Sequence, residues 1–215
     1  MQMVRSIARQ VFPKTVVPRR LPFGLAKGRS ANIDFRYDAA FYFGRHEPDL
    51  FVHYRRLVKP RMTCFDIGMY RGWDALNLSH LTGGKTFSFD GNPKCLDMAK
   101  QFLSPSGVDV TLINAYLASG ADGSLSLDQA SAKYGSPDFI KMDVEGAEAD
   151  VLSGAAATLS NGVPLIIETH GEKVENDCIQ TLRRFGYSIS VVNRSKMFSE
   201  ARSLEHNRWL ICEVV

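Results

Sequence analysis

Residues 62–81 read MTCFDIGMYRGWDALNLSHL, the pattern of a strand, a glycine turn and a helix. The short apolar run that ends at Ile67 is typical of a buried strand, and Trp73–Leu81 has the spacing of a helix. Gly68 and Gly72 between them let the backbone turn sharply and approach a ligand closely. This unit predicts a mainly parallel sheet covered by helices, because parallel strands are joined by crossovers.

The same alternation of strand and helix continues along the chain. Further strands are expected at 86–89, 108–113, 138–142, 164–167, 188–192 and 209–214. Helices are expected at 47–58, from Pro93 onward, and at 126–134, 146–159 and 177–185. Since the last two strands have no helix between them, we expect the final strand to run antiparallel, as an insertion or at an edge. The predicted fold class is α/β, a doubly wound Rossmann-like sheet that is mostly parallel with an antiparallel last strand.

The composition is that of an ordinary globular protein, with 215 residues, 45% hydrophobic and 23% charged. The four cysteines are scattered without a C-x-x-C pair, which argues against a disulfide framework or a zinc site and favours the reducing cytoplasm. The five histidines lack H-x-x-x-H spacing, so no protein-ligated metal is predicted, although a carboxylate-bound magnesium would leave little trace in a sequence. The apolar runs are too short to span a membrane.

Positive charge is concentrated at the N-terminus. Residues 1–33 carry seven basic residues and no acidic one, and the remainder has a net charge of −4. We therefore expect an irregular basic arm over 1–33, with a short amphipathic helix at 3–12, and a folded domain over 34–215. The arm is either a solvated leader or a contact for a phosphate-rich surface such as a membrane periphery.

Polar residues end the first three predicted strands, and in an open α/β sheet ligands bind outside the carboxyl ends of the strands. Asp66 starts the pattern D-x-G-x-x-x-G, which differs from the G-x-G-x-x-G of nicotinamide enzymes and suits a cationic ligand better than a diphosphate. A purely structural strand-to-helix turn is the alternative. Asp90, at the end of the second strand, can accept hydrogen bonds from both hydroxyls of a ribose, and the alternative is a helix N-cap or turn residue. Asn114 ends the third strand, where it could meet an adenine edge.

The strongest signal is the stretch FIKMDVEGAE at residues 139–148. Strand alternation places Asp143 and Glu145 on the same side of the mouth of the sheet. Two carboxylates there could bind an amino group, order a hydroxyl or share a proton. The alternative is that Glu145 and Glu148 only complement the positive end of the following helix.

The fifth strand ends IIETHG at residues 166–171. We expect Glu168 and His170 to be exposed at the strand end beside the fourth strand, where they are placed for acid–base chemistry. A purely structural histidine is the alternative for His170.

Together these motifs resemble those of the FkbM family of S-adenosylmethionine-dependent methyltransferases. The resemblance is carried by IKMDVEGAEADVLSG at 140–154, FDIGMYRG at 65–72 and FSFDGNP at 87–93, with IIETHG, RRFGY and EHNRWL similar as well. It covers about residues 47–215. The chain departs from the family at residues 69–71 and in the short stretch between Asn114 and Asp128.

The resemblance implies a role for each matching residue. Asp66, Gly68 and Gly72 would line the methionine end of S-adenosylmethionine, Asp90 would hold the ribose, Asn114 would lie near the adenine, and Asp143 and Glu145 would face the methyl group and the acceptor. It also implies O-methylation of a small-molecule or glycan acceptor, such as a sugar or secondary-metabolite hydroxyl.

Transfer to a hydroxyl requires a base for its proton, and the candidates are, in order, Glu145, Asp143 and His170. Two other functions stay open: a nicotinamide-dependent oxidoreductase and a catalytically silent binding module of the same fold. A nucleic acid acceptor is not expected, because aromatic and basic residues do not interleave and no N-P-P-[YF] strand end occurs.

Overall fold

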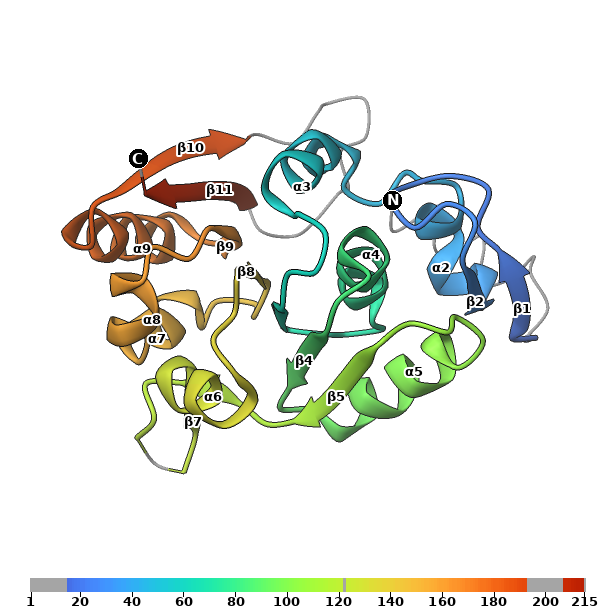
Figure 1. Ribbon diagram of the computed structural model, residues 1–215, viewed down its shortest axis with the longest axis horizontal. Coiled ribbons are helices and arrows are strands. Elements are labelled where there is room, and N and C mark those ends of the chain that lie inside the picture. The colour runs from blue at the N-terminus through green and yellow to red at the C-terminus, as the bar shows by residue number, and fades with distance from the viewer. Residues whose placement is uncertain (1–14, 122, 193–206, 215) are drawn as a thin grey trace.

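The computed structural model describes residues 15–121, 123–192 and 207–214. A seven-stranded sheet in the order β10-β11-β9-β8-β3-β4-β5 runs through the molecule (Figure 1). Its strands are β3 (Cys64–Ile67), β4 (Thr86–Asp90), β5 (Val110–Asn114), β8 (Phe139–Met142), β9 (Leu165–His170), β10 (Tyr187–Val192) and β11 (Asn207–Val214). The first five pair in parallel, and β11 is inserted antiparallel between β9 and β10. The predicted fold class is confirmed, and the last strand is the insertion rather than the edge.

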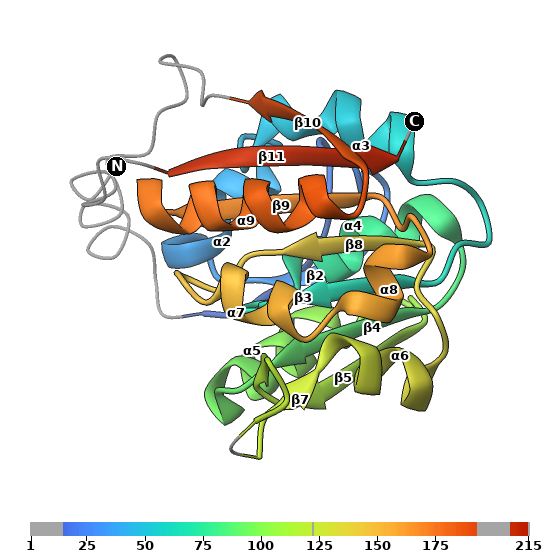
Figure 2. The same cartoon turned by 90° about the vertical axis from the view of Figure 1, so that its left-hand side faces the viewer.

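Helices cover both faces of the sheet (Figures 1 and 2). One face is covered by η1 (Pro48–Leu50), α3 (Phe51–Leu57), α4 (Trp73–Thr82) and α5 (Pro93–Leu103); the other by α6 (Leu127–Tyr134), α7 (Glu148–Ser153), α8 (Ala156–Ser160) and α9 (Glu172–Arg184). Strand alternation divides the core between them. Phe65 and Ile67 of β3 pack in the core with α6 to α9, whereas Cys64 packs in the core with α3 and α4. We refer to these as the α6–α9 face and the α3–α4 face.

Two predicted helix starts have the expected caps. The Asn92 side chain accepts a hydrogen bond from the Lys94 amide ahead of α5, which has Pro93 at its first position. Ser126 and Gln129 form a capping box at the start of α6. Polar residues that satisfy free backbone amides therefore mark these boundaries in the sequence.

The single helix predicted over 146–159 is wrong, because the structure has two helices, α7 and α8. The first helix ends before Gly154, where a Cβ atom would lie 2.6 Å from the carbonyl oxygen of Ala118. The Asp128 carboxylate then accepts the backbone amides of Ala157 and Thr158 at 2.9 and 2.8 Å, so it caps a new helix. The α9 helix also begins earlier than predicted, at Glu172.

The N-terminal segment is more regular than predicted. β1 (Val17–Arg20) pairs antiparallel with β2 (Ser30–Ile33), and α2 (Phe35–Tyr42) follows. The predicted irregular structure is wrong for residues 17–33, because apolar side chains there, including Leu21 and Ile33, are buried in a core with α4 and α5. The helix predicted at 3–12 lies outside the described residues.

Two short strands, β6 (Leu117–Ala118) and β7 (Leu125–Ser126), pair with one another between β5 and α6.

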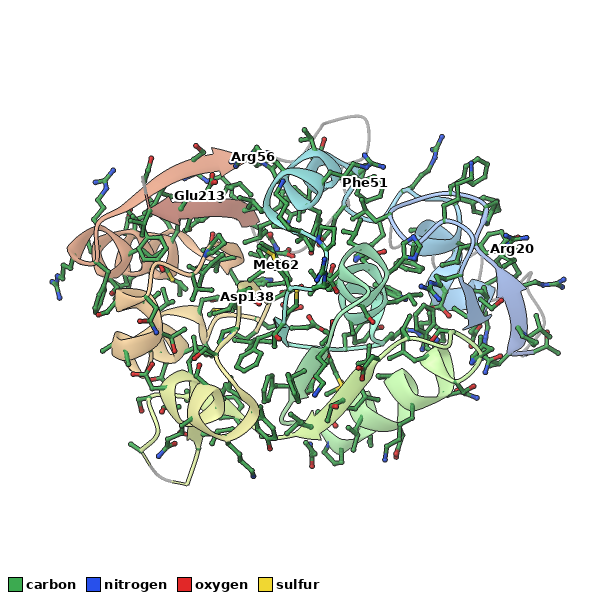
Figure 3. All side chains as sticks on the ribbon, in the orientation of Figure 1. Arg20, Phe51, Arg56, Met62, Asp138 and Glu213 are labelled. Carbon is green, nitrogen blue, oxygen red and sulfur yellow. The ribbon has the colours of Figure 1, made fainter. Side chains whose placement is uncertain are left out.

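On the opposite side of the molecule, the Arg56 side chain of α3 points toward Glu213 of β11 (Figure 3), and two hydrogen bonds of 2.6 Å join them. No helix in the described part of the chain combines the length and apolar character needed to cross a membrane.

Candidate functional site

The carboxyl ends of β3, β4, β8 and β9 meet at one edge, at the point where the strand order reverses. From β3 the chain proceeds outward to β4 and β5 and then returns to β8 on the other side of β3. Such a reversal opens the crevice in which open α/β sheets bind their ligands. The predicted site residues at these strand ends therefore share one edge.

Gly68 sits at the centre of this edge, directly after β3. Its φ is +96°, and a Cβ atom would lie 1.8 Å from the backbone oxygen of Asp143, so no other residue fits without moving the backbone. Gly72, with φ +82°, precedes the first residue of α4. Gly68 thus brings the turn against the end of β8, whereas a Cβ atom at Gly72 would lie 3.2 Å from the Leu103 side chain of α5. The sharp turn between them is the one that the sequence predicts.

Asp90 and Asn114 lie together at the ends of β4 and β5. The half-buried Asp90 carboxylate accepts the backbone amides of Tyr70 and Asn92 at 3.1 and 2.8 Å. The Asn114 side chain is exposed and donates a 2.8 Å hydrogen bond to the Asp90 carbonyl. Each carboxylate oxygen of Asp90 can still accept a hydroxyl, so the geometry is compatible with the predicted binding of a ribose.

Asp66 lies deeper than the other predicted ligand-binding residues. It is buried on the α3–α4 face and accepts a 2.5 Å hydrogen bond from the Ser88 hydroxyl. Burial, with the nearby Asp74 carboxylate, raises the pKa of Asp66 to about 7, against the opposing effects of Ser88 and Lys141. The Asp66 carboxylate thus belongs to a buried layer beneath the edge, whereas Asp90 and Asp143 are only half-buried.

This buried layer contains further charged residues that sequence reasoning missed. Lys141 pairs in register with Asp66, and its Nζ lies 3.8 Å from an oxygen of Asp74. The Tyr54 hydroxyl donates a 2.7 Å hydrogen bond to the other Asp74 oxygen. Burial raises the pKa of Glu47, and the pKa of Lys141 is also raised because nearby carboxylates outweigh the effect of burial. A lysine in the middle of the apolar strand FIKM was the available signal.

The three predicted catalytic residues lie together around the His170 imidazole. Its Nε2 is 3.3 Å from Glu145 Oε2, 3.5 Å from Asp143 Oδ1 and 3.8 Å from Glu168 Oε1. Its Nδ1 is 2.7 Å from Glu148 Oε1. Burial lowers the pKa of His170, but the Glu148 hydrogen bond and the neighbouring carboxylates outweigh burial and raise it.

Two exposure predictions are wrong at this cluster. Glu168 and His170 are buried rather than exposed, and only 1% of the His170 side chain is accessible. β9 pairs with both β8 and β11, and Glu148 at the start of α7 covers the end of the strand. Glu148 also accepts the Gly146 amide at 3.0 Å, so it both satisfies the helix start and holds His170.

Glu145 has an uncommon backbone conformation, with φ at 53° in the left-handed region. Its side chain is 73% exposed, unlike those of Glu148 and Glu168. A non-glycine residue in this region costs on the order of 1–3 kcal/mol and persists where the surrounding structure enforces it. Glu145 is the member of the cluster whose carboxylate is most open to an incoming molecule.

The glycine turn is braced by the N-terminal helix α2. Arg71 donates hydrogen bonds of 2.6 and 2.8 Å to the two oxygens of Asp38, and Trp73 Nε1 donates to Asp38 at 3.0 Å. Both members of the ion pair are buried. Arg71 lies in the segment where the chain departs from the FkbM motif, and the sequence carried no signal that would pair it with Asp38.

Solved structures of other proteins have a similar fold. An S-adenosylmethionine-dependent O-methyltransferase of Thermotoga maritima superposes with a TM-score of 0.58 at 16% identity, covering 79% of this chain and 66% of that chain. An rRNA methylase of Streptococcus thermophilus gives 0.57 at 15%, covering 77% and 96%. Aeropyrum pernix fibrillarin with natively bound S-adenosyl-L-methionine gives 0.53 at 19%, covering 74% and 68%. No curated protein sequence matches the chain significantly.

At these identities, the solved structures show the fold alone. The family evidence comes from the sequence of residues 121–189, which match the Methyltransferase FkbM domain. That segment contains the DVEGAE motif, α7, β9 and all of α9. The resemblance to the FkbM methyltransferases is therefore confirmed over residues 121–189, which match the model of their domain, and the chain has the same kind of α/β fold as the solved methyltransferases.

Proposed function

We propose that this protein transfers a methyl group from S-adenosylmethionine to a hydroxyl group of a small-molecule or glycan acceptor. The observation that carries the proposal is the cluster of Glu145, Asp143 and His170 at the carboxyl edge of the sheet, beside the close approach of Gly68 to Asp143. The match to the FkbM domain supports methyl transfer, and the motif resemblance supports oxygen as the acceptor atom.

The residues at the edge fit S-adenosylmethionine. Asp90 offers carboxylate oxygens to the ribose diol, and Asp143 offers a negative charge to the cationic methionine end. A cavity of about 310 Å³ opens beside Tyr116, whose side chain packs close to Gly91 and is 55% exposed. The rest of the cavity is lined by residues of the β6–β7 region and by Asp150. Because Tyr116 packs against Gly91, the residue after Asp90, its ring is the surface on which we place the adenine.

S-adenosylmethionine supplies a methyl group on a positively charged sulfur, and the acceptor oxygen displaces S-adenosylhomocysteine in line. The protein mainly has to position the acceptor and to remove its proton. Glu145 is the base, because its carboxylate is the exposed one in the cluster. Asp143 orients the reactants, and His170, held by Glu148, lies next to the Glu145 carboxylate.

The proposal is tested by incubating the protein with S-adenosylmethionine and a panel of glycan and hydroxylated small-molecule acceptors. Mass spectrometry should detect S-adenosylhomocysteine together with an acceptor that has gained one methyl group. Glu145→Gln should bind S-adenosylmethionine normally and lose turnover, whereas the exposed Glu172→Gln should behave as wild type. Thermal stabilisation by a nicotinamide cofactor, with none by S-adenosylmethionine, would instead support the oxidoreductase.

A further inference from the structure

We infer that His170, Asp143 and Glu168 form a binding site for a first-row divalent cation such as Mn²⁺ or Zn²⁺. One ligand atom from each of these residues lies within 4.8 Å of the others. The inference deepens the proposed function, since a cation at this position would meet the acceptor oxygen. No spacing pattern in the sequence marks this site, because the three ligands come from two strand ends and include a single histidine.

The His170 ring presents an unsatisfied nitrogen to this site. Glu148 Oε1 already accepts the Gly146 amide, so it acts as an acceptor and the His170 Nδ1 carries the proton that points to it. The Nε2 then presents a lone pair. This atom is buried and has no hydrogen-bond partner among the described residues. A buried lone pair that faces carboxylate oxygens is unfavourable unless something positive lies between them.

The distances suit a shared cation. Two ligand atoms, each about 2.1 Å from one metal ion, are separated by about 3.0–3.4 Å at octahedral or tetrahedral angles. The Nε2 is 3.5 Å from Asp143 Oδ1 and 3.8 Å from Glu168 Oε1, so shifts of a few tenths of an ångström would complete the coordination. The Trp209 indole also donates to Glu168 at 3.3 Å, which restrains that ligand.

A proton on Nε2 is the competing explanation. An imidazolium would form charge-assisted hydrogen bonds of about 2.7–2.9 Å to a carboxylate. The three carboxylate oxygens around Nε2 stand at 3.3 to 3.8 Å instead, with none at that distance. The arrangement leaves room for an ion between the groups rather than joining them directly.

The surroundings resemble those of metal-binding histidines. A metal-ligating histidine usually donates its other ring N–H to a carboxylate, which fixes the ring and raises its basicity. Glu148 occupies that place and is fully buried. One imidazole with two carboxylates suits Mn²⁺ or Zn²⁺ better than Ca²⁺ or Mg²⁺, which prefer ligand sets made of oxygen alone.

The cation would act on the acceptor of the proposed reaction. Glu145 Oε2 lies 3.3 Å from the same Nε2, at the exposed end of the cluster. A hydroxyl that binds the ion there becomes more acidic, and Glu145 is placed to take its proton. His170 is then a metal ligand rather than a base, and Glu148 is a positioning residue.

The first test measures metal binding by the full chain without S-adenosylmethionine or acceptor. After treatment with EDTA and gel filtration, the protein is titrated with Mn²⁺ alone while electron paramagnetic resonance reports the free ion. We expect one Mn²⁺ per chain, at least tenfold weaker binding in His170→Gln and Asp143→Asn, and wild-type binding in Glu172→Gln. Circular dichroism verifies that the variants are folded. Wild-type protein that leaves the free Mn²⁺ signal unchanged overturns the site.

The second test observes the His170 ring directly. Zn²⁺ is added to ¹⁵N-labelled protein, and the ring nitrogens are followed by NMR. The expected result is a shift of the Nε2 resonance while Nδ1 stays protonated. An Nε2 that is protonated before and after Zn²⁺ overturns the inference in favour of the imidazolium. Titration with S-adenosylmethionine in EDTA is measured separately, so absence of metal binding with intact cofactor binding contradicts only the metal site.

Discussion

Glycine in place of Glu145 should stabilise the protein slightly while removing its activity. The backbone at this position has φ 53°, which costs a non-glycine residue about 1–2 kcal/mol. Glycine relieves that cost but loses about 0.5–1 kcal/mol through the greater freedom of the unfolded chain. The net gain lies between about 0 and 1.5 kcal/mol, or roughly 0–6 °C in melting temperature for a domain of this size.

The matched control is Glu145→Gln, which keeps the backbone cost and removes only the charge. Because the Glu145 side chain is 73% exposed, its unfolding free energy should stay within about 0.5 kcal/mol of wild type. Urea unfolding monitored by circular dichroism gives the free energies of unfolding of wild type, Glu145→Gly and Glu145→Gln in the same buffer. Both variants should lose about 10²–10⁴-fold in turnover, the range of a general base.

If Glu145→Gly unfolds at a lower urea concentration than Glu145→Gln, the predicted stabilisation is refuted. The Glu145 side chain would then stabilise the fold by more than the strained backbone destabilises it. The mechanistic prediction is refuted if Glu145→Gln retains wild-type turnover at saturating acceptor. A higher stability in the glycine variant combined with lost turnover would show that strain is retained here for function.

Other residues lead to further measurable outcomes. Lys141→Met should destabilise the protein by about 3–5 kcal/mol in urea unfolding, because it leaves the buried carboxylates around it without their cation. Asp38→Ala should lower the free energy of unfolding by a similar amount, because it leaves the buried Arg71 guanidinium without its carboxylate. Adding Arg71→Met should recover part of that stability, and a double variant no more stable than Asp38→Ala alone would contradict this. The raised pKa of Asp66 favours the protonated form in the folded state, so stability should fall as pH rises from about 4 through about 7, by at most about 4 kcal/mol. Asp66→Asn should remove that slope between about pH 4 and 7. Asp90→Ala should weaken S-adenosylmethionine binding more than turnover at saturating cofactor, and unchanged affinity by isothermal titration would exclude the ribose contact.

Local patterns were sufficient for most of the fold. The apolar run ending at Ile67 and the Asn92–Pro93 helix start are signals within a few residues, and the structure has both elements. The break at Gly154 was not predictable in this way, because it depends on contact with Ala118 and on a cap from Asp128, both distant in sequence. The β1–β2 pair was missed because its stability comes from burial against distant helices.

The site residues divide in the same way, into those that local sequence patterns mark and those that depend on contacts between distant segments. Asp143, Glu145 and His170 were identified because residues at the ends of parallel strands share an edge whatever the exact register. The burial of His170 and Glu168 depends on β11 inserting beside β9, and the link to Glu148 depends on how α7 meets that edge. Lys141 gains its role only through its register with Asp66 and its approach to Asp74. Such contacts between segments far apart in the chain leave little trace in a single sequence.

A crystal structure of the protein with S-adenosylhomocysteine would test the central claim most directly. We predict that the ribose hydroxyls bind the Asp90 carboxylate, that the adenine lies toward Tyr116, and that the sulfur faces the cluster of Glu145 and His170. A nucleoside bound away from the carboxyl edge of β3, β4 and β8, or with its sulfur turned from Glu145, would contradict the account.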